Sequence, residues 1–257
     1  SYDGDLERLL LDGLRAVALL AIFVVHANLG LAPGGFLAVS TFFTLSGFLI
    51  TALLVSEHRS KGRVALGMFW QRRARRLLPA SLIAVAGIVA ATLIFGDATQ
   101  NQKLFGDAVG TLAYVANWRF LLSGTTYAGE FSGQSPLLHF WSLAIEEQFY
   151  LLFPLVMVGA LAASARWRRA VPGVLLLGIA LSLVAGIVAS GAATTPDKLY
   201  FRTDIRAGEL LVGALFGYWW AGAGRNMGEW AHRVIRWSGG GLILLMLGLI
   251  ATSDYHN

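Results

Sequence analysis

The stretch LDGLRAVALLAIFVVHANL, residues 11–29, sets the class of this protein, because it is long and apolar yet carries ionisable side chains. A helix needs about 20 mainly apolar residues to cross a bilayer, and this stretch supplies them. Arg15 and His26 are eleven residues apart, about three helical turns, so both side chains project from one face roughly 16 Å apart. Ionisable groups are expensive in lipid and indicate function. The spacing favours one elongated ligand with a charged end and a reactive end.

The two side chains suit different tasks. The neutral imidazole of His26 can accept a proton from an attacking hydroxyl, as a general base does. Arg15 can pair with an anionic group nearer one membrane surface. A histidine that merely packs in a core is the alternative, and the membrane setting together with the shared face favours the functional interpretation.

Composition predicts an all-α, polytopic transmembrane helix bundle. Hydrophobic residues make up 56% of the chain, above the roughly 45–50% of ordinary globular domains. Seven spans are predicted, at about 9–29, 36–56, 78–96, 137–162, 171–191, 206–222 and 238–253. Residues 104–134 are read as a re-entrant or interfacial segment, because a full crossing there would break the alternation of loop charge.

The distribution of charge predicts the orientation. Basic residues gather in alternate connections, above all in 57–77, so the positive-inside rule places the N-terminus in the cytoplasm. The net charge of +5 therefore indicates topology and does not indicate nucleic-acid binding. The absence of cysteine excludes disulfides, thiolate catalysis and cysteine-ligated metals. No metal site is predicted.

The run QRRARRLLP, residues 71–79, combines four arginines with a proline. On a helix, Arg73 and Arg76 share one face, and Arg72 and Arg75 share another. Arginine forks bind phosphate oxygens in pairs, so the run is a candidate phosphate clamp. A stop-transfer cluster that only fixes orientation is the alternative. Pro79 is expected to begin the next span, as proline suits a first helical turn.

The segment PLLHFWSLAIEEQFY, residues 136–150, places two carboxylates and a glutamine inside an apolar span. Adjacent helical residues face about 100° apart, so we expect Glu146 or Glu147 to face a reaction cavity while the other pairs with a buried arginine or stays protonated. His139 is two turns from Glu146 and shares its face. The alternative is polar bonding that only holds the bundle together.

Residues 200–209, YFRTDIRAGE, form a fourth polar constellation at the predicted outer entrance of a span. Asp204, Arg206 and Glu209 are expected either to form a local charge network or to recognise a polar acceptor at the outer surface.

Five stretches resemble, in order, the motifs of the membrane acyltransferase 3 family. They are LDGLRAVALLAIFVVH at 11–26, TFFTLSGFLI at 41–50, RRARRLLPA at 72–80, LLHFWSLAIEEQFYLLFPL at 137–155 and FRTDIRAGELLVGAL at 201–215. The resemblance implies a multi-pass bacterial plasma-membrane O-acyltransferase with one transmembrane domain over residues 1–257. It would take an acyl group, expected to be acetyl, from cytoplasmic acyl-CoA. The acceptor would be a hydroxyl of an envelope glycan, glycolipid or related molecule.

The resemblance also assigns roles to individual residues. His26 would be the catalytic imidazole, as base or as transient acyl carrier, with Glu146 and Glu147 shaping the catalytic cavity. Arg15, Arg72, Arg73 and Arg76 would hold the CoA portion. His139, Asp204 and Arg206 are the candidates for binding the acceptor.

Family members have about ten spans, whereas seven are predicted here, so C-terminal helices are expected to be missing from residues 1–257. Two other classes fit buried His and Glu residues: a proton-coupled transporter, in which they form a relay, and a noncatalytic membrane scaffold. Neither explains the paired arginines or the ordered motifs.

Overall fold

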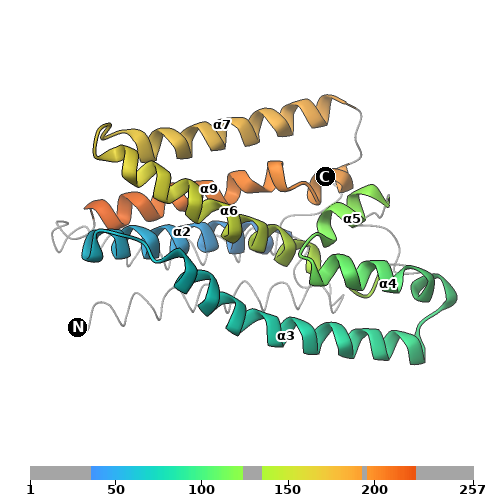
Figure 1. Cartoon of the computed structure of the whole chain (residues 1–257). Coiled ribbons are helices and arrows are strands. Elements are labelled where there is room, and N and C mark those ends of the chain that lie inside the picture. Colours follow the sequence, from blue (N-terminus) through green and yellow to red (C-terminus); the bar gives the residue numbers. More distant parts are fainter. Residues whose placement is uncertain (1–35, 124–134, 193–195, 224–257) are drawn as a thin grey trace. The chain divides into compact units, whose positions relative to one another are not determined.

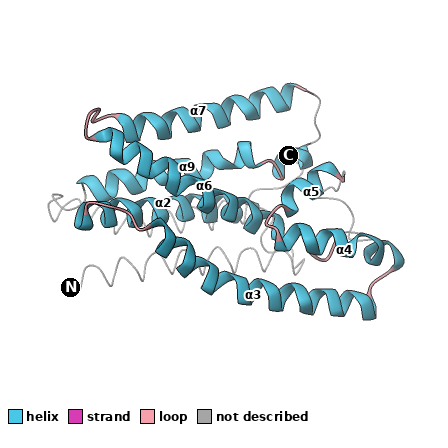
Figure 2. Ribbon diagram, viewed as in Figure 1, coloured by secondary structure: helices cyan, strands magenta, loops and turns pink. Residues whose placement is uncertain are grey.

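A computed structural model describes residues 36–123, 135–192 and 196–223 of the chain. These residues form helices joined by short turns, with no strand among them, which confirms the all-α prediction (Figure 2). The helices are α2 (Phe36–Lys61), α3 (Leu66–Phe95), α4 (Ala98–Leu112), α5 (Ala116–Leu122), α6 (Phe140–Ser164), α7 (Ala170–Gly191), α8 (Pro196–Tyr200) and α9 (Thr203–Ala223). The predicted spans 9–29 and 238–253, and with them Arg15 and His26, lie outside the described residues.

Four of the described helices are long and apolar enough to cross a membrane: Val39–Lys61 within α2, and the whole of α3, α6 and α7. They correspond to the predicted spans 36–56, 78–96, 137–162 and 171–191, within a few residues at each end except at the start of α3. The predicted span 206–222 also forms a helix, within α9. Its first turns carry Asp204, Arg206 and Glu209.

The connection between α2 and α3 differs from the sequence prediction. Residues 57–77 were expected to form a long basic connection, with Pro79 opening the next span. Instead α2 continues to Lys61, a short turn follows, and α3 begins at Leu66 with Pro79 inside it. Arginine, glutamine and leucine are good helix formers, and one proline removes only a single backbone hydrogen bond from so long a helix. Gly62 ends α2 with φ of +68°, a left-handed conformation that favours glycine.

Residues 104–134 contain no helix long enough to cross a membrane in the part that the structure describes, up to residue 123. Helices α4 and α5 have 15 and 7 residues. At about 1.5 Å per residue neither reaches the roughly 30 Å of a hydrocarbon core. Asp97 caps α4 by accepting a hydrogen bond from the backbone N–H of Gln100, while the Gln100 side chain accepts from the N–H of Asp97.

The chain divides into two compact units, residues 56–208 and residues 1–55 with 209–257. Within the first of these, α6 is the central element, in contact with α3, α4, α5 and α7 (Figure 1). Its buried side chains run along its whole length, from Trp141 through Phe149 and Phe153 to Leu161. Outward-facing residues of α3 and α7, such as Ile83 and Ile187, are exposed and apolar, as expected of lipid-facing surfaces.

In the second unit, the described parts of α2 and α9 approach closely through glycines. A Cβ atom at Gly213 would overlap the carbonyl oxygen of Thr44, and one at Gly47 would overlap that of Leu210. Small residues let helix backbones meet in this way inside membranes. Ser40 Oγ donates a hydrogen bond of 3.0 Å to Glu209 Oε1 beside this contact.

We predict that Gly213→Ala destabilises the protein by about 1–3 kcal/mol, because the added methyl group must separate two backbones. Gly87→Ala in α3 is the matched control, since nothing lies within 4 Å of the position of its Cβ. It should be neutral or stabilise by up to about 1 kcal/mol through helix propensity. Thermal unfolding in detergent measures both, and equal stability of the two variants would contradict the close contact.

Candidate functional site

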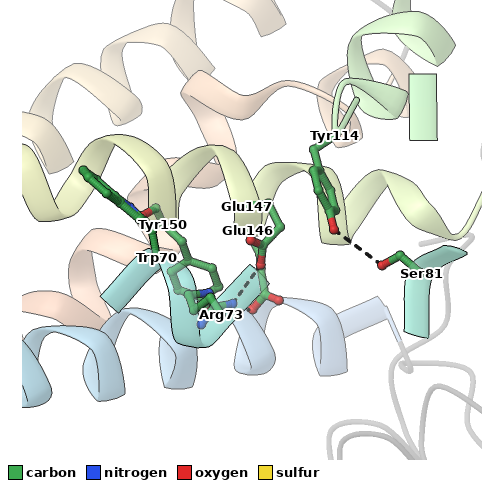
Figure 3. A network of polar contacts seen from close by, with 7 residues as sticks. All are labelled: Trp70, Arg73, Ser81, Tyr114, Glu146, Glu147 and Tyr150. Atoms are coloured by element: carbon green, nitrogen blue, oxygen red, sulfur yellow. Dashed lines mark hydrogen bonds and ion pairs between the residues drawn. The ribbon is translucent and has the colours of Figure 1, made fainter. Parts of the chain in front are cut away.

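Two polar contacts fix α3 against α6. The indole Nε1 of Trp70 donates to the carbonyl oxygen of Tyr150 at 3.0 Å. Arg73 Nη2 donates to Glu147 Oε1 at 2.7 Å and forms an ion pair with it (Figure 3). From Trp70 to Arg73 the contacts move three residues forward along α3, while their partners on α6 move three residues back, from Tyr150 to Glu147. The two helices therefore run antiparallel, in a register that polar groups determine.

The guanidinium of Arg73 is also stacked on an aromatic ring. Its central carbon lies 3.4 Å from the centroid of the Tyr150 ring, which is cation–π geometry. The Tyr150 hydroxyl in turn donates to Glu146 Oε1 at 3.4 Å, so both glutamates of α6 connect to the same pair of side chains (Figure 3). The side chains of Arg73 and Glu147 are only 25% and 15% exposed. The predicted pairing of one glutamate with a buried arginine is present here, at Glu147.

On α6 the ion pair lies inside a membrane-spanning candidate, and on α3 it belongs to the arginine-rich first turns. Glu147 is seven residues after the start of α6 and seventeen before its last residue, Ser164. These separations correspond to about 10 Å and about 25 Å of helix. A carboxylate inside an apolar span is costly, and an arginine that only set topology would not need to pair with it, so the contact with Glu147 favours a functional role for Arg73.

The other arginines of the run have a different environment. Arg72, Arg75 and Arg76 are exposed on the first turns of α3, next to the partly buried Arg73. They lie on the same continuous helix as the apolar span, because α3 begins at Leu66. Four cations thus share one rigid element, but they differ in burial and in their contacts.

A second polar network joins α5, α6 and the start of α9. Asn117 is fully buried, and its amide donates to the carbonyl oxygen of Phe201 at 2.8 Å and to Thr203 Oγ1 at 2.9 Å. Gln148 donates to Asn117 Oδ1 at 2.9 Å and accepts from Thr203 Oγ1 at 2.7 Å. Networks of this kind hold a unique arrangement because a lost partner leaves a buried polar group unsatisfied.

The turn between α4 and α5 supports both networks. Tyr114 has φ of +54°, a left-handed conformation that is unusual for a bulky side chain. Its carbonyl oxygen accepts from Gln148 Nε2 at 2.8 Å, and its hydroxyl lies 3.5 Å from Ser81 Oγ on α3. Arg119 Nε donates to the buried Asp107 at 2.6 Å and closes the α4–α5 pair.

The start of α6 and the start of α9 meet in an aromatic and charged cluster. Trp141 contacts Tyr200 edge to face at 5.5 Å between ring centroids. The guanidinium carbon of Arg206 lies 4.1 Å from the Tyr200 centroid, and Arg206 Nε donates to the Tyr200 carbonyl oxygen at 3.4 Å. His139 is exposed, directly before α6.

Asp204 is held by a neighbour that the expected charge network did not include. Arg202 donates to both of its carboxylate oxygens, Nε to Oδ1 at 3.0 Å and Nη2 to Oδ2 at 2.5 Å. These hydrogen bonds lower the pKa of Asp204 and raise the pKa of Arg202. Of the three residues expected in a charge network, Asp204 pairs with Arg202, Arg206 stacks on Tyr200, and Glu209 accepts a hydrogen bond from Ser40.

The structure thus brings together some of the predicted site residues. Arg73 pairs with Glu147, and Tyr150 connects Glu146 to this pair. At the start of α6, His139 and Arg206 lie near Trp141. Asp204 pairs with Arg202. Arg72 and Arg76 remain exposed on α3. Among residues 36–123, 135–192 and 196–223, no three His, Asp or Glu side chains come together as a metal site.

Several residues of these networks were missed from the sequence. Tyr150 and Trp70 look like ordinary apolar-span residues, and only the register of α3 against α6 shows what they contact. Asn117 gave a usable signal, because an asparagine within an apolar stretch must find hydrogen-bond partners. Its partners came from α6 and α9, which are distant in sequence.

The long apolar helices are those of a polytopic membrane protein. Its candidate site is the buried polar network between α3 and α6. The chain belongs to the acyltransferase family: the model of the family's acyltransferase domain matches residues 8–257. This confirms the family expected from the five motifs.

Curated relatives in three bacteria are similar to most of the chain. The O-acetyltransferase OatA of Staphylococcus aureus is 41% identical over 82% of the chain and 34% of its own length. The peptidoglycan O-acetyltransferase OatA of Listeria monocytogenes is 37% identical, over 82% of the chain and 33% of its own length. The putative peptidoglycan O-acetyltransferase YrhL of Bacillus subtilis is 38% identical, again over 82% of the chain and 33% of its own length. The chain thus spans about a third of the length of these relatives. No solved structure matches the chain.

We predict that Asn117→Ala lowers stability by about 1–3 kcal/mol, because Gln148 and Thr203 each lose a buried partner. Asn101→Ala is the matched control, since Asn101 is exposed on α4. Chemical denaturation in detergent compares the two variants. Equal stability would contradict the network.

Proposed function

We propose that residues 1–257 form the transmembrane acyltransferase domain of an O-acetyltransferase. It would transfer an acetyl group from cytoplasmic acetyl-CoA to a hydroxyl of an envelope glycan of the peptidoglycan type. Family membership and the printed names of the relatives support the reaction class and the acceptor class. The observation that carries the donor assignment is the arginine-rich start of α3, fixed to α6 by the Arg73–Glu147 ion pair.

The donor would bind at the arginine-rich end of α3. Exposed guanidinium groups of Arg72 and Arg76 suit the phosphates of CoA, which arginine binds in bidentate fashion. Arg73 and, on the first predicted span, Arg15 would also contact the CoA portion. With the basic connections in the cytoplasm, as the positive-inside rule predicts, acyl-CoA would enter from that side of a bacterial plasma membrane.

His26 would carry the proton in the transfer step. The acceptor oxygen forms a bond to the acetyl carbonyl carbon, the carbon–sulfur bond breaks, and the hydroxyl proton passes to His26 and then to the departing CoA thiolate. In the alternative route the acetyl group is first transferred from CoA to His26 and then from His26 to the acceptor hydroxyl. The overall reaction, with its products acetylated acceptor and CoA thiol, is the same. Glu146 would border this reaction cavity, and an acetyl-histidine adduct trapped without acceptor would distinguish the two routes.

The acceptor would bind at the cluster formed by the starts of α6 and α9. His139 is exposed there, Arg206 supplies a cation beside the Tyr200 ring, and Asp204 supplies an anion that pairs with Arg202. Charged and planar side chains beside aromatic rings suit the hydroxyl and amide groups of a glycan. These residues precede α6 and open α9, away from the basic turn that follows α6.

We predict that His26→Ala abolishes acetyl transfer while leaving acetyl-CoA binding within about twofold, because the imidazole handles the proton and not the nucleotide. The protein in lipid nanodiscs is given acetyl-CoA and peptidoglycan fragments, and the release of CoA thiol is followed. His58→Ala, in the last turn of α2, is the matched control and should retain wild-type activity.

The outcomes separate the three functional classes. Transfer that survives in His26→Ala would remove the catalytic assignment. A wild-type protein that binds no acyl-CoA would favour the scaffold, and proton-coupled movement of a solute into vesicles without acyl transfer would favour the transporter.

A further inference from the structure

Arg73 differs from the arginines that flank it. Arg72, Arg75 and Arg76 are exposed, whereas Arg73 is partly buried between α3 and α6. Its charge faces Glu147 at 2.7 Å, and one face of its guanidinium lies on the Tyr150 ring at 3.4 Å. Figure 3 shows these three side chains grouped together, with the guanidinium beside the ring and the carboxylate.

This environment makes Arg73 a poor ligand for a phosphate. A carboxylate within hydrogen-bond distance already balances the positive charge, so a second anion would meet both the cation and Glu147. The guanidinium still has N–H groups to donate. Its Nε is buried and finds no hydrogen-bond acceptor among the described residues. An unsatisfied buried donor is costly, and an uncharged carbonyl oxygen would satisfy it without adding charge.

We infer that Arg73 binds the uncharged, carbonyl-bearing arm of the acyl donor, and that Glu147 is a positioning residue that holds Arg73 in place for this contact. The inference rests on the proposed function and divides its donor site into two parts. Arg72 and Arg76 meet the phosphates at the exposed start of α3. Arg73 meets an amide or thioester carbonyl of the pantetheine arm on the face of α3 that contacts α6.

The position of the pair agrees with the shape of such a donor. Acyl-CoA has its phosphates at one end, its thioester at the other, and amide carbonyls along the flexible arm between them. Arg73 lies in the same run of α3 as Arg72 and Arg76, but its guanidinium faces α6, whereas theirs are exposed. A neutral amide enters such a partly buried, charge-balanced position at much lower cost than a phosphate does. An N–H donor on the face of α3 that contacts α6 therefore fits the arm better than the nucleotide.

The test compares two donors that differ in their phosphates. Tritiated acetyl-CoA is bound to the protein in lipid nanodiscs and displaced either by unlabelled acetyl-CoA or by S-acetylpantetheine, which carries the amides and the thioester but no phosphate. Arg73→Gln and Glu147→Gln are expected to weaken both competitors by the same factor, roughly tenfold for Arg73→Gln and less for Glu147→Gln. Arg76→Gln is expected to weaken acetyl-CoA alone.

A matched control separates positioning from packing. Gly213→Ala disturbs the close contact of α2 with α9, so it should lower thermal stability without changing either affinity. A Glu147→Gln variant that behaves like Gly213→Ala would overturn the positioning role. Arg73→Lys, which keeps the charge but loses Nε, is measured beside Arg73→Gln in case the latter folds poorly.

The remaining outcomes are distinct. Loss of acetyl-CoA affinity with unchanged S-acetylpantetheine affinity in the Arg73 variants would make Arg73 a phosphate ligand and overturn the inference, while the proposed function stands. Unchanged affinity for both donors would also overturn it. A wild-type protein that binds neither donor would overturn the proposed function itself.

Discussion

The ion pair between Arg73 and Glu147 is the constraint on which the described site depends. Moving either charge alone into an apolar span would be expensive, so each side chain needs the other. Their contact, together with the hydrogen bond from Trp70 to Tyr150, fixes α3 antiparallel to α6 in one register. That register sets where every other arginine of α3 lies. Because α6 also contacts α4, α5 and α7, the same pair links the arginine run to the rest of the unit formed by residues 56–208.

The polar side chains of this unit divide by chemistry along α6. Near the Arg73 pair they are charged, balanced and stacked, which suits a donor with an anionic end and an uncharged arm. Around Asn117 they are neutral amides and hydroxyls with short hydrogen bonds, which suit a rigid support. At the starts of α6 and α9 they are aromatic and charged and partly exposed, which suits a glycan. The proposed transfer requires that the donor and the acceptor bind at different places along one helix bundle.

Apolar run lengths and the ordered motifs were enough to predict the helices, most spans and the family. The cost of two carboxylates in an apolar span also led to the expectation that one of Glu146 and Glu147 would pair with a buried arginine or stay protonated, and Glu147 pairs with Arg73. The partner of that glutamate, the stacking on Tyr150 and the role of Asn117 could not be predicted, because they depend on the register between helices distant in sequence. The start of α3 was misjudged because Pro79 signals a helix start locally, whereas good helix formers and contacts to α6 extend the helix back to Leu66. His26 and Arg15 stay predictions, since they lie outside the described residues.

Photo-crosslinking tests most directly whether acyl-CoA occupies the surface organised by Arg73 and Glu147. A diazirine-bearing acyl-CoA analogue is irradiated with the protein in lipid nanodiscs, and the labelled peptides are identified by mass spectrometry. The account predicts labelling of residues 66–80 of α3 and 143–154 of α6 that an excess of acetyl-CoA removes. Labelling that acetyl-CoA does not displace, or that avoids both segments, would contradict it.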